Sequence, residues 1–161
     1  MKVSERHDYD AAPDTVWAMI TDPAWREQVC AATGAIRWDV VVDADETGGT
    51  VEVTRVLPAE LPDPVRRLVG DTVTVTQAET WGPAAADGTR RADVQLRVKG
   101  QPATMTATST LAPAAGGTRL LMSGELTVKI PLVGGRLEKE LARAVSIALQ
   151  KEQDVGRTYL A

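Results

Sequence analysis

The chain has 161 residues, of which 43% are hydrophobic, and a formal net charge of −4. This length corresponds to one domain, residues 1–161, with enough apolar side chains to enclose a core. The acidic balance and the scattered Lys and Arg residues exclude the basic surface that a nucleic-acid backbone requires, so we expect no nucleic-acid partner.

The chain shows no targeting or membrane signal. Its longest apolar runs fall far short of the roughly 20 residues of a bilayer span, and its start, "MKVSERHDYD", lacks the apolar segment of a signal peptide. We therefore expect a cytoplasmic protein without membrane insertion. The oligomeric state is left open.

The cysteine and histidine content limits the chemistry. The single cysteine, Cys30, has no partner for an intrachain disulfide, and one histidine, His7, is too few for a Cys/His zinc site. We expect no metal and no cofactor. Cys30 is predicted to be a small buried apolar side chain, not a nucleophile.

The first third of the chain predicts one strand and two short helices. Residues 2–10 alternate weakly between polar and apolar, which indicates a strand. Pro13 is suited to the first turn of a helix that runs to Ile20, and Asp22-Pro23 ends that helix and starts a second one, to about Ala32.

After Gly34 the apolar period changes to two, which predicts six further strands in an antiparallel meander. Their apolar positions are Ile36 to Val42, Val51 and Val53, Val73 and Val75, Val94 to Val98, Met105 to Leu111, and Leu120 to Val128. The turn "DETGG" joins the first two. Asp43 also begins a partial calcium-loop spacing, but Thr54 occupies the position of the required Glu, so a hairpin turn is predicted.

An insert, "LPAELPDPVRRLVGD", interrupts the meander with a short helix from Asp63-Pro64 to Gly70. Connections of this length between neighbouring strands are uncommon and often functional. One interpretation is an ordinary solvated excursion. The favoured one is a mobile lid, residues 58–70, over a cavity mouth, with Val65, Leu68 and Val69 as its apolar side.

The last segment, residues 136–158, predicts a long amphipathic helix that packs across the sheet. Leu137, Leu141, Val145 and Ala148 follow one helical face, and Glu152 and Val155 continue it more loosely. Gly134-Gly135 precedes this helix as a flexible entry.

This order of elements, together with the motif "DAAPDTVWAMITDPAWRE", resembles the START-like helix-grip (SRPBCC) superfamily over the whole chain. Within it, "VTVTQAETW" paired with "KIPLVGGRLEKEL" resembles an uncharacterised actinobacterial family of unknown function. The resemblance implies an α+β helix-grip fold: a curved seven-stranded antiparallel sheet that grips the long C-terminal helix. It also implies a cavity between them for sterols, lipids, polyketides or other apolar molecules. Members include carriers, cyclases and hydrolases, so the resemblance transfers no reaction.

Strand parity predicts which side chains face this cavity. Val3, Glu5, His7 and Tyr9 share one face of the first strand. The same rule brings Arg55 to the interior with Val53, and Gln77 and Glu79 with Val75. The predicted ligand-binding residues are His7, Tyr9, Trp38, Arg55, Val75, Gln77, Glu79, Met105, Met122 and Leu141.

His7 is the centre of the chemical question. A carboxylate beside an imidazole in an apolar pocket suits general acid–base work, which makes His7, Glu5 and Glu79 candidate catalytic residues. The alternative, which we favour, is that the carboxylates are paired or hydrated and that His7 lines the pocket with a hydrogen bond to Glu5, Glu79 or a hydroxyl.

Two functions therefore remain open, and we favour the first. It is the non-catalytic binding of a hydrophobic or amphipathic small molecule, such as a lipid, a sterol or a polyketide. The alternative is an enzyme of the polyketide cyclase or dehydratase type that uses His7 and a nearby Glu. A protein-interaction module would need an exposed apolar patch, which the Thr-rich outer face of the sheet does not offer.

Overall fold

The structure is a computed structural model that describes residues 1–161, except the side chains of Val65 and Leu68. The strands are β1 (Lys2–Tyr9), β2 (Arg37–Asp45), β3 (Gly48–Pro58), β4 (Thr72–Trp81), β5 (Arg90–Val98), β6 (Ala103–Ala114) and β7 (Gly117–Val128). The helices are α1 (Pro13–Ile20), α2 (Pro23–Ala32), α3 (Asp63–Val69) and α4 (Gly134–Leu160).

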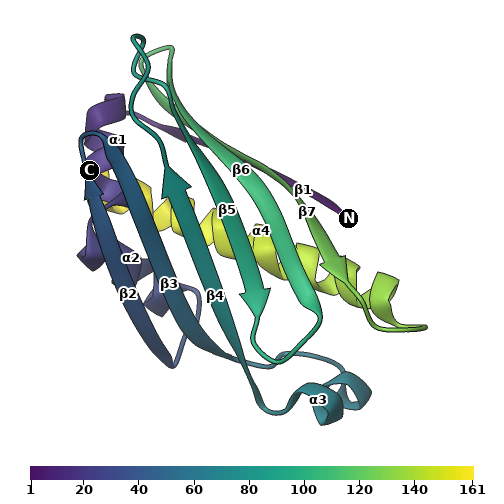
Figure 1. The fold of residues 1–161 in the computed structure, drawn as a ribbon. Helices are drawn as coiled ribbons and strands as arrows, with labels where there is room; N and C mark the ends of the chain where they lie inside the picture. The colour runs from purple at the N-terminus through teal and green to yellow at the C-terminus, as the bar shows by residue number, and fades with distance from the viewer.

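All strands form one antiparallel sheet, in the order β1-β7-β6-β5-β4-β3-β2 (Figure 1). Strands β2 to β7 are the predicted meander, and β1 closes the far edge by pairing with β7. The hairpin turn predicted at "DETGG", Asp45–Gly49, is present: Asp45 accepts hydrogen bonds from Thr47, and Gly48 has a φ of 115°. A side chain on Gly48 would also collide with the carbonyl oxygen of Trp81.

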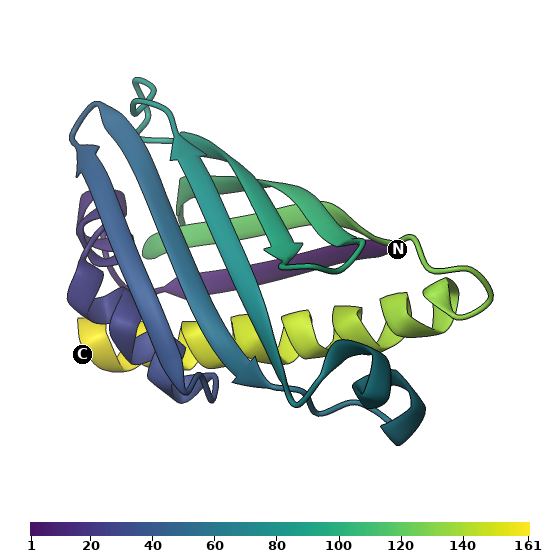
Figure 2. The same ribbon diagram turned by 60° about the horizontal axis from the view of Figure 1, so that its bottom comes forward.

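Helix α4 crosses one face of the sheet, and α1 and α2 lie near its C-terminal end (Figure 2). Its apolar side packs through Leu141, Val145 and Val155 against the main core, which explains why this amphipathic segment is helical and where it docks. At its end, the Tyr159 hydroxyl donates to Asp22, the N-cap of α2, at 2.6 Å. The predicted α+β helix-grip fold is thus confirmed. No helix among the described residues is long and apolar enough to cross a membrane.

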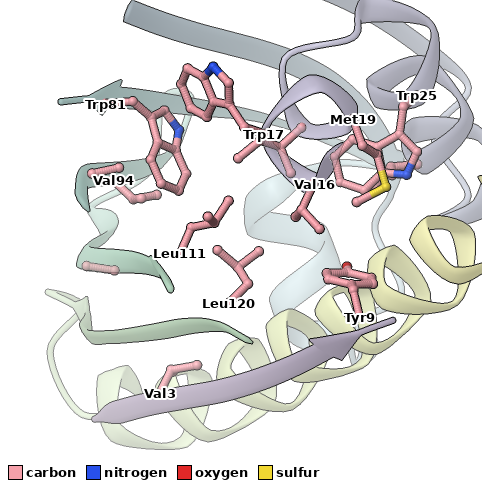
Figure 3. Packing of buried hydrophobic residues seen from close by; sticks show 14 of the residues in the cluster. Val3, Tyr9, Val16, Trp17, Met19, Trp25, Trp81, Val94, Leu111 and Leu120 are labelled. Atoms are coloured by element: carbon pink, nitrogen blue, oxygen red, sulfur yellow. The ribbon is translucent and has the colours of Figure 1, made fainter. Parts of the chain in front are cut away.

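The core lies between the sheet and the helices. Trp81, Leu111 and Leu120 of the sheet point toward Val16 of α1 and Tyr9 of β1 (Figure 3). Cys30 is fully buried in a second cluster with Val51 and Val53, as a small apolar residue would be.

Helix α3 lies at the same end of the molecule as the start of α4 (Figures 1 and 2). The insert is anchored by a hydrogen bond from the Ala59 amide to the Asp71 carbonyl, at 2.8 Å. The predicted apolar side of the lid falls partly outside the described residues, because it includes the side chains of Val65 and Leu68.

Candidate functional site

A small cavity lies between the sheet and the C-terminal half of α4. Its volume is about 30 Å³. A cavity needs roughly 10–15 Å³ of such volume for each water molecule, so this one has room for a few waters. Its lining consists of Glu5, His7, Ile20, Arg26, Gln77, Glu79, Trp81, Val94, Ser109, Leu120, Met122, Leu149 and Glu152.

This cavity is smaller than the ligand-sized one that the sequence predicts. Large side chains occupy the space between the layers: Trp81 and Leu120 enter from the sheet, and Leu149 enters from α4. None of the described residues of the insert 58–70 lines it, so the insert does not cover this cavity as the lid prediction required. The reason is that the insert connects the end of β3 to the start of β4, whereas Trp81 lies at the other end of β4.

An ion pair between Arg26 and Glu79 forms one wall. Asp22 caps α2 and Pro23 starts it, which turns Arg26 toward the interior one turn later. The Arg26 guanidinium donates to both carboxylate oxygens of Glu79, at 2.8 and 3.0 Å, and its Nε donates to the Ile20 carbonyl at 2.7 Å. Both side chains are nearly inaccessible, with exposures of 5% and 6%.

Glu79 is fully engaged in this wall. Besides Arg26, its carboxylate accepts from the Gln77 amide at 2.6 Å and from the Trp81 indole at 2.7 Å. Burial by itself would raise the pKa of Glu79, but the Arg26 charge and these donors outweigh it and the pKa is lowered. Glu79 is therefore an ionised structural anchor and not a base with a free oxygen.

His7 faces the cavity from β1 and is 3% exposed. Neither of its ring nitrogens has a hydrogen-bond partner among the described residues. Burial lowers the pKa of His7, against the opposing effect of Glu5, so the imidazole is neutral at neutral pH. A neutral imidazole offers one donor and one acceptor, and neither is paired with a described residue.

Glu152 lines the cavity from α4. It forms no salt bridge with a described residue within 4.0 Å, although the charge of Arg26 is near enough to influence it. Burial of the carboxyl group raises the pKa of Glu152, and the negative charge of Glu79 adds to this while Arg26 opposes it. Unlike Glu79, which is paired with Arg26, Glu152 thus lines the cavity without a cation among the described residues in direct contact.

The structure places five of the predicted site residues in the cavity wall: Glu5, His7, Gln77, Glu79 and Met122. The inward direction that parity predicts for His7 is confirmed, whereas its predicted hydrogen bond is wrong. Glu79 was a predicted partner, but its oxygens are taken by Arg26, Gln77 and Trp81. That the five bind a ligand stays a prediction.

Six other predicted ligand residues lie outside this wall. Trp38 is 39% exposed because it belongs to the edge strand β2. Tyr9 is packed beneath Gly156 of α4, and Met105 is core, with 1% exposure. Arg55 bonds to Gln77 and Thr33 instead of entering the cavity. The remaining two, Val75 and Leu141, are half-buried farther along the interior.

Three polar residues of the cavity wall were not predicted as site residues from the sequence: Arg26, Ser109 and Glu152. Arg26 lies on a short helix whose face toward the sheet was not predicted. Parity gives a signal for Ser109, since it shares a strand face with Met105 and Leu111. Helical spacing gives a signal for Glu152, because this residue continues the apolar face of α4.

Comparison with solved structures identifies the fold. The aromatase/cyclase ZhuI from Streptomyces sp. R1128 matches with a TM-score of 0.68 at 10% identity, over 99% of this chain and 92% of that one. A STAR-related lipid transfer protein from Xanthomonas axonopodis matches with a TM-score of 0.64 at 17% identity, over 98% and 84%. The protein TTHA0849 from Thermus thermophilus matches with a TM-score of 0.65 at 16% identity, over the whole of both chains. These similarities confirm the START-like fold.

Comparison of sequences identifies the family. Uncharacterised proteins of Mycobacterium tuberculosis and Mycobacterium bovis are 31% identical over 110 residues, which are 65% of this chain. The match spans 63% of the length of these mycobacterial relatives. The model of the family DUF2505, proteins of unknown function, matches residues 4–160. The chain therefore belongs to the DUF2505 family.

Proposed function

We propose that the protein binds an amphipathic small molecule between the sheet and α4. The polar end of the molecule occupies the cavity beside His7 and Glu152, and its apolar body extends along the interior toward the start of α4. The observation that supports this proposal most strongly concerns His7. Its side chain is 3% exposed and lines the cavity, and neither ring nitrogen is paired with a described residue. Buried polar atoms are paired with protein, water or ligand.

An apolar strip continues from the cavity and provides the surface for the apolar body. Val75 lies two residues before Gln77 on the same face of β4. Its neighbour Val98 and Leu141 of α4 pack against the same buried cluster. All members of this strip are half-buried, so apolar area remains to be covered by a ligand: Val73, Val75, Leu96, Val98, Leu141 and Val145. Covering such area is favourable by about 25 cal/mol per Å².

The fold comparisons support the proposal by analogy. Two of the similar structures are described as a lipid transfer protein and an aromatase/cyclase, names that refer to hydrophobic or polyketide-type molecules. At 10% and 17% identity they share the fold with this chain and need not share its ligand.

The test uses N-phenyl-1-naphthylamine, a neutral apolar dye whose fluorescence increases on burial. Ser109 lines the cavity from β6, whereas its neighbour Thr108 points to the exposed outer face. We expect Ser109→Leu to fill the cavity and weaken dye binding by about tenfold. The matched control Thr108→Leu should leave binding unchanged. Absence of saturable dye binding to the wild-type protein, or equal binding by both variants, would refute the proposal. Native mass spectrometry of gently purified protein would identify a co-purifying ligand.

A second candidate is a cyclase- or dehydratase-like reaction with His7 as the base. One observation favours it: neutral His7 shares the cavity with Glu5 and Glu152, and the raised pKa of Glu152 suits a proton donor. The test measures, for one compound, both its binding to the His7→Gln variant and its conversion by that variant. A base typically supplies ~100- to 10,000-fold, so conversion should vanish while binding persists. If the wild-type protein returns the bound compound unchanged, this candidate is excluded.

A further inference from the structure

We infer that the cavity selects a ligand whose polar end is a protonated amine over one that ends in a carboxylate or phosphate. This inference rests on the proposed function and names the class of ligand for the same site. It follows from which polar groups of the wall are already paired and which remain available.

The cation of the cavity wall already has a carboxylate as its counter-ion. Arg26 donates two hydrogen bonds to Glu79, and its Nε donates to the Ile20 carbonyl. Such a two-point contact is the strongest form of the arginine–carboxylate pair. An anionic ligand that took over this contact would leave Glu79 as a buried carboxylate without its partner.

The groups that remain available are mainly acceptors. Glu152 lines the cavity without a salt bridge to a described residue, and Glu5 adds a second carboxyl group at the wall. His7 contributes a neutral ring with an unpaired acceptor nitrogen. An ammonium group carries three donors and no acceptor, and it therefore complements this set.

Binding of an ammonium group would also favour the ionised form of Glu152. Burial disfavours the charged form of Glu152, which raises the pKa of its carboxyl group. A cation alongside would allow Glu152 to ionise and form a charge-assisted hydrogen bond. A ligand carboxylate would instead add a further acidic group to a wall that already holds Glu5, Glu79 and Glu152.

Arg55 is another buried cation of the interior, and an anionic ligand could pair with it instead. It is 8% exposed and its Nε has no partner among the described residues. However, its guanidinium donates to Gln77 at 3.0 Å and to Thr33 at 3.4 Å, behind the wall and not in it. The alternative of an anion at Arg55 is therefore included in the test.

The test compares decylamine, 1-decanol and decanoate, which share one chain and differ in their polar end. Each compound is titrated as a competitor of bound N-phenyl-1-naphthylamine on the wild-type protein and on the variants Glu152→Gln and Glu140→Gln. The compounds are kept below their micellar concentrations, at physiological salt. Glu140 is exposed on the same helix, so this control removes the same charge outside the cavity. We expect decylamine to bind about tenfold or more tightly than decanoate. Glu152→Gln should remove most of that preference, and Glu140→Gln should retain it.

Three results would overturn the inference. Decanoate binding as tightly as decylamine would overturn it, and loss of that decanoate binding in Arg55→Met would assign the polar end to Arg55. An equal effect of Glu152→Gln and Glu140→Gln would show a general charge effect. In these cases dye binding by the wild-type protein still supports the proposed function, whereas absence of dye binding refutes both.

Discussion

The ion pair of Arg26 and Glu79 should be essential to stability, and Glu79→Gln tests this directly. The substitution retains the size of the side chain but leaves Arg26 as a buried cation without a counter-ion, since the Arg26 side chain is 5% exposed. Loss of one partner of a buried pair costs about 3–5 kcal/mol. With stabilities of typically about 5–15 kcal/mol, this is a large fraction of the total free energy of unfolding.

Urea unfolding monitored by circular dichroism measures this loss. For a slope of about 1–3 kcal/mol per M, the midpoint should fall by roughly 2 M. The double variant Arg26→Met/Glu79→Gln removes the unpaired charge and should be more stable than Glu79→Gln alone. As a control, Asp8→Asn removes an exposed carboxylate paired with Arg119 and should scarcely move the midpoint. A double variant less stable than Glu79→Gln would contradict this reasoning.

Two further predictions concern α4 and the pH dependence of stability. Gly156→Ala would place a methyl group 2.8 Å from a ring carbon of Tyr9, so crowding of about 1–3 kcal/mol should outweigh a helix-propensity gain of about 1 kcal/mol and lower the melting temperature. Gly135→Ala, on the same helix with open space around it, should maintain or raise it; equal behaviour of the two variants would disprove the crowding. Because the folded-state pKa of His7 is lowered from its ordinary 6.5, its contribution to stability is present above pH 6.5 and is lost as the pH falls through the folded-state pKa. Urea titrations across this range should show a slope that His7→Gln removes, and an unchanged slope in that variant would assign the effect to another group.

The strands and their inward faces were predictable because each depends on local alternation. Once Val3 and Tyr9 are taken as interior, the pleat requires His7 to share their face, and the structure confirms its burial. The same argument brings Glu79 to the interior with Val75. Parity gives the direction of a side chain, however, and not its depth: it assigned Trp38 to the wall, but the sheet order places β2 at an edge.

The partners across the cavity were not predictable from one sequence. Arg26 and Glu79 are 53 residues apart and belong to a helix and a strand, so their pairing depends on how α2 docks on the sheet. The docking also determines the size of the cavity, because Leu149 of α4 and Trp81 of β4 approach from opposite layers. Local periodicity carries no information on either distance.

Helix α4 itself favours one orientation of the proposed ligand. Its first half presents Leu141 and Val145 toward the sheet, where neighbouring apolar side chains are also half-buried. Its second half presents Glu152 to the cavity and then Gly156, whose missing side chain admits the Tyr9 ring. The face of this helix toward the sheet is therefore apolar in its first half and carries one carboxyl group, that of Glu152, among apolar residues in its second half. An amphipathic molecule that lies along it gains most when its charged end faces Glu152 and its apolar end faces the start of the helix, since the reverse orientation would bury a charge among aliphatic groups.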